Sequence, residues 1–162
     1  ANLFCKVRSL KTVVMLEAEE IVDGDLNVGA PFSDTCVNNC CFPKLRKIGA
    51  YAFNYCPITS LDEENFPVLN EVGDAAFIGC PIEKLDLPSL EQIGKCSFKN
   101  CPVSIVNLPG LLSIDAEGFS GCKNLRSFSA EKVQQVGANC FSSCPLLSSI
   151  SCDLGPEKFT CN

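Results

Sequence analysis

The sequence repeats itself at intervals of 21 to 24 residues, and this period limits the possible folds more than any other feature. In each repeat a Cys follows a Phe by three residues, and an Ile or Val precedes that Phe by five. The equivalent positions are Phe53, Phe77, Phe98, Phe119 and Phe141; Cys56, Cys80, Cys101, Cys122 and Cys144; and Ile48, Val72, Ile93, Ile114 and Val136. A fixed period of about 20 to 29 residues is typical of a solenoid, in which short units stack and bury a continuous core.

Each repeat divides into a short strand and an arc. Residues 84–88 alternate apolar and polar side chains, which predicts a strand, and the counterparts lie at 60–63, 105–108, 127–130 and 149–152. Residues 90–101 have apolar side chains at mixed spacing, which predicts a tight arc with a helical or 3₁₀ turn. Because parallel strands need a crossover connection, we expect the arcs to join the strands of one parallel sheet.

The clear repeats run from residue 45 to residue 152 without a linker. Residues 1–44 match the period poorly, although a degenerate copy is visible around Phe32 and Cys36. Since a terminal repeat must cover the end of the core, we interpret residues 1–44 as an N-terminal cap. Residues 153–162 lose the period and contain a Gly-Pro pair that breaks regular structure, so we expect a C-terminal cap or tail there.

Thirteen cysteines usually indicate a secreted protein held together by disulfides. Five of them share one repeat position, however, and parallel coils would space these side chains by about 4.8 Å. Because the Cβ atoms of a disulfide lie about 3.8 Å apart, we expect these five to form a buried column of free thiols. The sequence leaves open the pairing of Cys5, Cys36, Cys40, Cys41, Cys96, Cys152 and Cys161, including a clip between Cys152 and Cys161.

The unit Pro-x-Leu-x-x-Ile-Gly-x-x-x-Phe-x-x-Cys-Pro at 88–102 resembles the BspA-like, or Treponema-type, class of leucine-rich repeats. The Ala-Phe pairs at 52–53 and 76–77 match the usual unit of this class, and the resemblance covers residues 45–152. It implies an α/β solenoid, a right-handed superhelix with a parallel concave β-sheet and short helical, 3₁₀ or irregular convex arcs. It also implies a surface protein of a host-associated bacterium or a parasitic protist, in some cases an adhesin, and it brings no catalytic residues.

Composition and motifs argue against an enzyme, a metal site and a nucleic-acid partner. The chain has no His, which excludes the common nucleophilic triads and His-containing zinc sites. Asp23-x-Asp25 matches the start of a calcium loop, but the required Gly and the bidentate Glu are missing. The net charge is −6 and the basic residues are scattered, unlike the basic stripe of a nucleic-acid binder. We therefore expect no catalysis, no cofactor and no metal, and we find no apolar run of about 18 residues that could span a membrane.

The outward surface of the predicted sheet is the remaining candidate for function, because solenoids use such extended faces for binding. Alignment of the strands places two polar columns there, without an aromatic residue in either. The candidate ligand-binding residues are Ser60, Asp62, Lys84, Asp86, Asn107, Ser129 and Ser151. One alternative is that these columns are only a solvated sheet surface without a ligand. Another is that recognition takes place through the arcs or through an insertion at 62–67.

We interpret the chain as a monomeric, non-enzymatic module that binds a protein ligand, such as a host or extracellular-matrix protein. Its expected location is the cell surface or the extracellular space, and Ala1 at the start predicts a processed or trimmed chain. The alternative is a cytoplasmic leucine-rich-repeat scaffold whose cysteines stay reduced.

Overall fold

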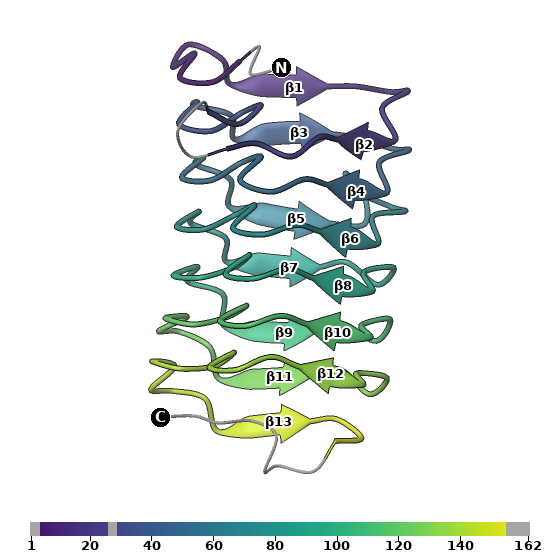
Figure 1. The fold of residues 1–162 in the computed structure, drawn as a ribbon, viewed down its shortest axis with the longest axis vertical. Helices are drawn as coiled ribbons and strands as arrows, with labels where there is room; N and C mark the ends of the chain where they lie inside the picture. Colours follow the sequence, from purple (N-terminus) through teal and green to yellow (C-terminus); the bar gives the residue numbers. More distant parts are fainter. Residues whose placement is uncertain (1–3, 26–28, 155–162) are drawn as a thin grey trace.

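The computed structural model describes residues 4–25 and 29–154 of the 162-residue chain. These residues wind into coils that stack along the long axis of the molecule (Figure 1). Strand β1 (Thr12–Val14) lies near one end of the stack and β13 (Ser149–Ser151) near the other. All the paired strands are parallel to their neighbours, which confirms the predicted parallel-sheet solenoid.

Two long parallel sheets and one short sheet hold the coils together. The five-stranded sheet has the order β13-β11-β9-β7-β5, with β5 at Ser60–Asp62, β7 at Lys84–Asp86, β9 at Ile105–Asn107 and β11 at Ser127–Ser129. The six-stranded sheet has the order β12-β10-β8-β6-β4-β2, with β2 at Glu20–Ile21, β4 at Lys47–Ile48, β6 at Glu71–Val72, β8 at Gln92–Ile93, β10 at Ser113–Ile114 and β12 at Gln135–Val136. The two-stranded sheet pairs β1 with β3 (Asn39–Cys41).

Side-chain alternation explains why the strands of the five-stranded sheet form where they do. The central residue of each strand points into the core and its two neighbours point outward, as the two-residue period of a strand requires. Leu61 pairs in register with Leu85, Leu85 with Val106 and Val106 with Phe128, and all four are buried. The core is therefore built from like positions of consecutive coils.

A column of phenylalanine rings runs through this core. Neighbouring rings have centroids 5.0–6.0 Å apart and lie within 13° of parallel. The members are Phe4, Phe32, Phe53, Phe77, Phe98, Phe119 and Phe141. Phe4 and Phe32 continue the column beyond the five rings of the clear repeats, so the core extends into residues 1–44. The division of that segment from the repeats as a cap stays a prediction.

The expected α/β composition with helical or 3₁₀ arcs is wrong, because the described residues contain no helix. Each arc instead holds a two-residue strand of the six-stranded sheet, followed by a turn. In the turn the backbone N–H groups of Cys96, Phe98 and Asn100 donate to carbonyls of the next coil, at 2.9–3.0 Å. A helix needs these donors for its own carbonyls, and Cys96 and Asn100 also have φ of 57° and 64°, outside the right-handed helical region.

In the coil around Phe32, Thr35 occupies the position that the column cysteines hold in the clear repeats. The Thr35 hydroxyl donates to the carbonyl of Phe32 at 2.8 Å and lies 3.5 Å from the Cys56 sulfur. In the coils, the residue three positions after the Phe faces the core, so Thr35 takes that place and Cys36 is only half-buried. The degenerate copy around Phe32 therefore has Thr35 in place of the column Cys, and Cys36 follows one residue later.

Candidate functional site

The outward side chains of the five-stranded sheet lie together on one side of the stack. We call this surface the five-stranded face. Its members are Ser60, Asp62, Lys84, Asp86, Ile105, Asn107, Ser127, Ser129, Ser149 and Ser151. Strand pairing puts the seven candidate ligand-binding residues Ser60, Asp62, Lys84, Asp86, Asn107, Ser129 and Ser151 on it. A rigid hydrogen-bonded backbone therefore spaces these polar groups at one strand interval.

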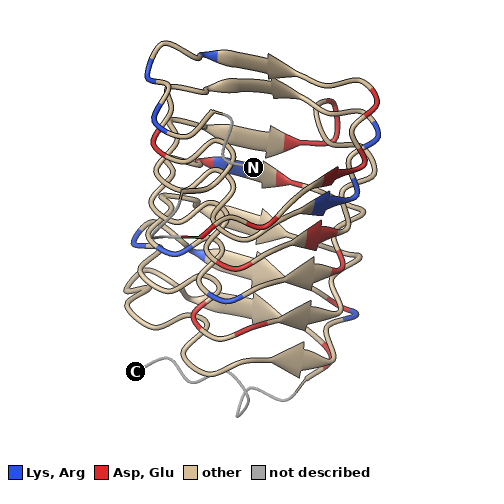
Figure 2. Ribbon diagram, turned by 45° about the horizontal axis from the view of Figure 1, so that its top comes forward, with Lys and Arg blue, Asp and Glu red and all other residues tan. Residues whose placement is uncertain are grey.

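The charged residues of the five-stranded face are gathered at β5 and β7. Asp62 lies directly opposite Asp86, and like charges in that position are unfavourable. Lys84 offsets them only in part, because its Nζ lies 3.8 Å from Oδ2 of Asp86 and both side chains are mostly exposed. Elsewhere acidic and basic segments are interspersed over the coils (Figure 2). This end of the face favours a cationic group on whatever it binds.

Asp62 also has a structural contact. Its Oδ1 accepts hydrogen bonds from the backbone N–H and the side-chain Nδ2 of Asn65, at 3.2 and 2.8 Å. These bonds close the turn at the start of the 62–67 insertion. One carboxylate oxygen of Asp62 is thus already engaged, whereas the Asp86 carboxylate contacts Lys84 at 3.8 Å and no other cation among the described residues.

Ile105 is the apolar member of the five-stranded face and was not among the predicted ligand-binding residues. Its side chain is 62% exposed, although it begins a strand whose central residue, Val106, is buried. The alternation of the strand already predicts its outward position, in one column with Ser60 and Lys84, but the predicted ligand-binding residues are polar side chains only, which leaves Ile105 out. The face therefore changes from charged to apolar to Ser-rich along the stack.

The five column cysteines carry a hydrogen-bonding pattern of their own. Each thiol donates to the carbonyl oxygen of the column Phe in the preceding coil, at 3.0–3.3 Å. The donors are Cys56, Cys80, Cys101, Cys122 and Cys144, and the acceptors are Phe32, Phe53, Phe77, Phe98 and Phe119. No disulfide joins two cysteines within the described part of the chain. Cys161, the other half of the suggested clip with Cys152, lies outside the described residues.

Burial makes these thiols poor nucleophiles. Loss of hydration raises the pKa of Cys122 and of Cys40 to about 12, and that of Cys140 to about 11. The pKa values of Cys80 and Cys101 are raised for the same reason. Because the thiolate is the reactive form, burial lowers the reactivity of Cys80, Cys101 and Cys122 at neutral pH.

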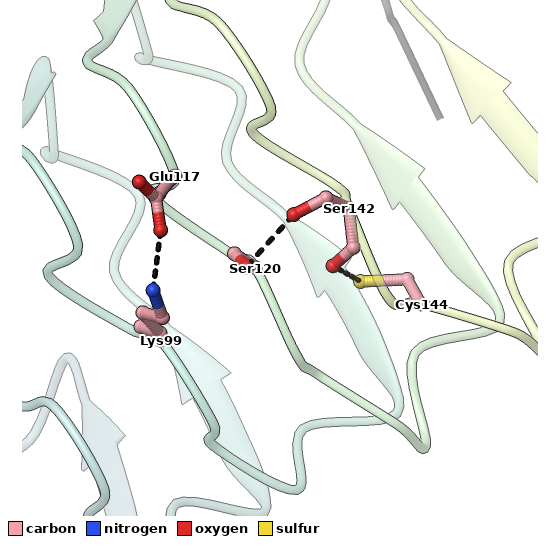
Figure 3. A network of polar contacts seen from close by, with 5 residues as sticks. All are labelled: Lys99, Glu117, Ser120, Ser142 and Cys144. Carbon is pink, nitrogen blue, oxygen red and sulfur yellow. Dashed lines mark hydrogen bonds and ion pairs between the residues drawn. The ribbon is translucent and has the colours of Figure 1, made fainter. Parts of the chain in front are cut away.

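The turns that follow the six-stranded sheet form another surface, which we call the turn face. It consists of Asp34, Tyr51, Tyr55, Ile78, Gly79, Cys96, Lys99, Asn100, Glu117, Gly121, Asn139, Ser142 and Ser143, with the buried Asn54, Ala75 and Ser120 in the same turns. Lys99 pairs with Glu117 of the next coil, and the Ser120 and Ser142 hydroxyls lie 2.9 Å apart (Figure 3). The Lys99 hydrogen bond lowers the pKa of Glu117.

Both tyrosines of the chain lie on the turn face, whereas the five-stranded face has no aromatic side chain. Tyr51 and Tyr55 have φ of 58° and 54°, and Tyr55 is 60% exposed. The sequence holds a signal for this conformation, because Gly79, Asn100 and Gly121 occupy the position equivalent to Tyr55. Gly and Asn are the residues that most readily adopt the left-handed region.

Other kinds of site receive little support from the described residues. Within them, no group of three or more Cys, Asp or Glu side chains is arranged to hold a metal ion. A hollow of about 340 Å³ lies between Asn100 and Lys123, and a smaller one of about 140 Å³ lies over Glu71 and Gln92. None of the described segments forms an apolar helix of membrane-spanning length.

Comparison with known proteins agrees with the repeat architecture. A family model described as a BspA type leucine rich repeat region matches residues 30–101 and 46–160, in six copies. The crystal structure of a leucine rich cell surface protein from Faecalibacterium prausnitzii A2-165 superimposes with a TM-score of 0.53 at 14% sequence identity. The superposition covers 98% of this chain and 64% of the other, so this chain spans less than two thirds of that protein. No curated protein matches the sequence.

Proposed function

Because the chain belongs to the BspA-type leucine-rich repeat family, we propose that it is a non-enzymatic module that binds another protein at the cell surface. Binding is non-covalent, and the module acts as a monomer. The observation that carries this proposal is the five-stranded face, on which parallel strands hold polar side chains in register over five coils. A preorganised face of this kind loses little entropy when a partner docks.

The chemistry of the five-stranded face indicates what kind of partner surface would fit. The acidic end at Asp62 and Asp86 attracts a basic patch, Ile105 offers apolar contact, and the serines supply hydrogen bonds. We assign the ligand-binding role to Ser60, Asp62, Lys84, Asp86, Asn107, Ser129 and Ser151. An extracellular-matrix protein of the host is the partner class that we propose, in the manner of an adhesin.

Direct binding measurements test this role with purified fibronectin, laminin and collagen as probes. We expect at least one of them to bind the immobilised chain in a saturable way. Asp86→Lys combined with Ser129→Lys should abolish that binding, because both changes place a long cation on the five-stranded face. The matched control, Gln92→Lys combined with Gln135→Lys, puts the same charges on exposed positions of the six-stranded sheet and should bind normally.

Two outcomes would contradict the proposal. If none of the three proteins binds, the chain is not a matrix adhesin. If both double variants bind equally, the partner does not use the five-stranded face.

A cytoplasmic scaffold whose cysteines stay reduced is the second candidate, and the absence of a disulfide between described cysteines is compatible with it. The cell-surface assignment rests on the family and on the name of the similar solved structure. Thiol titration of the unfolded protein, purified without reductant, separates the two. All 13 thiols free would favour the cytoplasm, whereas recovery of thiols only after reduction would favour an oxidising compartment.

A further inference from the structure

Tyr55 is a large aromatic side chain in an exposed and conformationally expensive place. Its φ of 54° lies in the left-handed region, which is unfavourable for any residue with a bulky side chain. At the equivalent positions of later coils the chain has Gly79, Asn100, Gly121 and Ser143, all of them small. Core packing does not account for the tyrosine, because its side chain is 60% exposed. The left-handed conformation recurs along the stack, for example at Asn100 and Ser143, so the exposed aromatic ring is what distinguishes Tyr55.

The ring of Tyr55 is held in position by the next coil. A Cβ atom built on Gly79 would lie 2.5 Å from Cε1 and 2.6 Å from Cδ1 of Tyr55. One side of the ring therefore lies directly against the Gly79 backbone, in space that any other residue would fill. The backbone N–H of Tyr55 donates to the carbonyl of Ile78 at 3.0 Å, which fixes the turn beneath the ring. The exposed part of the ring is thus a preorganised platform.

The coil before this platform carries an exposed carboxylate. Asp34 occupies the position equivalent to Tyr55 in the preceding coil, and its backbone N–H donates to the carbonyl of Asn54 at 3.3 Å. The Asp34 side chain is exposed, and it forms no ion pair with any residue in the described ranges. Lys6 stands next along the same column, but it is not within ion-pair distance of Asp34. The coil before Tyr55 therefore presents a carboxylate that has no ion-pair partner among the described residues.

We propose that Tyr55 and Asp34 bind an arginine side chain of a partner polypeptide. A guanidinium group is planar and weakly hydrated, so it stacks on an aromatic ring while its N–H groups pair with a carboxylate. The net charge of −6 adds a general attraction for a basic partner. The site lies on the turn face, so it is distinct from the five-stranded face, and neither assignment depends on the other.

The test uses the full chain and three short peptides that differ in one residue. The peptides are Gly-Gly-X-Gly-Gly, with X as arginine, lysine or citrulline; citrulline has the shape of arginine without its charge. Titration is followed through the backbone amide resonances in NMR spectra, which report on every part of the stack. We expect the arginine peptide to shift the resonances of Tyr55 and Gly79, and to bind about two- to fivefold more tightly than the citrulline peptide, which is the size of an exposed cation–π contact.

Four variants separate a binding role from a structural one. Tyr55→Asn introduces the residue that the chain has at Asn100, so the fold should be equally or more resistant to urea while arginine binding weakens by about two- to fivefold. Asp34→Asn should weaken binding and reduce its salt dependence. Gly79→Asn should also weaken binding, because its side chain displaces the ring. Gly121→Asn is the matched control, since it makes the same change at an equivalent left-handed position away from Tyr55 and should bind normally.

The proposal is overturned if the arginine and citrulline peptides bind equally, or if Tyr55→Asn leaves binding unchanged while destabilising the fold. It is also overturned if the arginine peptide does not bind. Glucose serves as an uncharged probe that can lie against an aromatic ring, and the proposal fails if glucose produces the same shifts as the arginine peptide. Shifts confined to β7 and β9 would reject the Tyr55 site and support the five-stranded face, so the two assignments fail independently.

Discussion

At the scale of single residues, each core side chain has an equivalent neighbour in the coil on either side. Phe98 illustrates this, since its ring lies 5.7 Å from that of Phe77 and 5.4 Å from that of Phe119, and it is fully buried. The Cys101 thiol nearby satisfies the carbonyl of Phe77. A change at one position in the column therefore affects the packing of two other coils.

Phe98→Ala should lower the free energy of unfolding by about 3–5 kcal/mol, because it removes a fully buried ring and leaves a cavity between two others. Urea unfolding of the variant and the parent measures this difference. Lys95→Ala in the same coil is the control, and it should change stability little because its side chain is exposed. A loss below about 1 kcal/mol for Phe98→Ala would mean that the ring is not a core support.

At the scale of elements, the close approach of the coils limits the size of the residue that follows β8 in the six-stranded sheet. A Cβ atom on Gly94 would lie 2.8 Å from the backbone N of Asp74 and 2.8 Å from the carbonyl carbon of Gly73. Backbone atoms cannot move aside without disturbing the hydrogen bonds between β6 and β8. Asp115 takes the equivalent position one coil later, so the path of the chain there already accommodates a Cβ atom.

Gly94→Ala should therefore destabilise the protein by about 1–3 kcal/mol, as overpacking does, although Gly→Ala usually stabilises by restricting the unfolded chain. Asp115→Ala is the matched control and should be close to neutral. Thermal or urea unfolding of both variants measures the contrast. Equal behaviour of the two would show that the coils can separate at Gly94 without cost.

At the scale of the whole molecule, the stack holds many groups that burial keeps neutral. The thiol of Cys122 has a pKa of about 12 in the folded protein, against an ordinary value of 9.0. Below pH 9 the thiol is protonated in both states, so its full contribution to stability is present there. Above pH 9 the unfolded chain releases this proton and the folded protein retains it, so stability falls as pH rises toward 12.

Unfolding in urea, with a reductant present, should therefore show a loss of stability as pH rises from about 9 toward about 11, contributed by several thiols. Each one contributes up to about 1.4 kcal/mol per pH unit above its unfolded pKa. Cys122→Ala should reduce the slope, while lysine titration affects the variant and the parent alike. Identical slopes for the two proteins would contradict the raised pKa.

The contrast between sequence and structure is clearest in the arcs. Apolar spacing in residues 90–101 indicated a helical or 3₁₀ turn, yet Phe98 donates its backbone N–H to Gly118 in the next coil. That partner is 20 residues away, so no local pattern reveals it. Likewise, the outward position of Ile105 follows from strand alternation, but the seating of Tyr55 on Gly79 does not.

By itself, the sequence determined that parallel strands stack at a fixed period, because a repeated pattern of apolar residues can be buried only by equivalent neighbours. It also determined which strand residues face outward, since side chains alternate along a strand. Only the tertiary structure decided the path of the arcs, the second long sheet and the support of the Tyr55 ring. Those depend on hydrogen bonds and close approaches between coils, and they exist only once the coils are in contact.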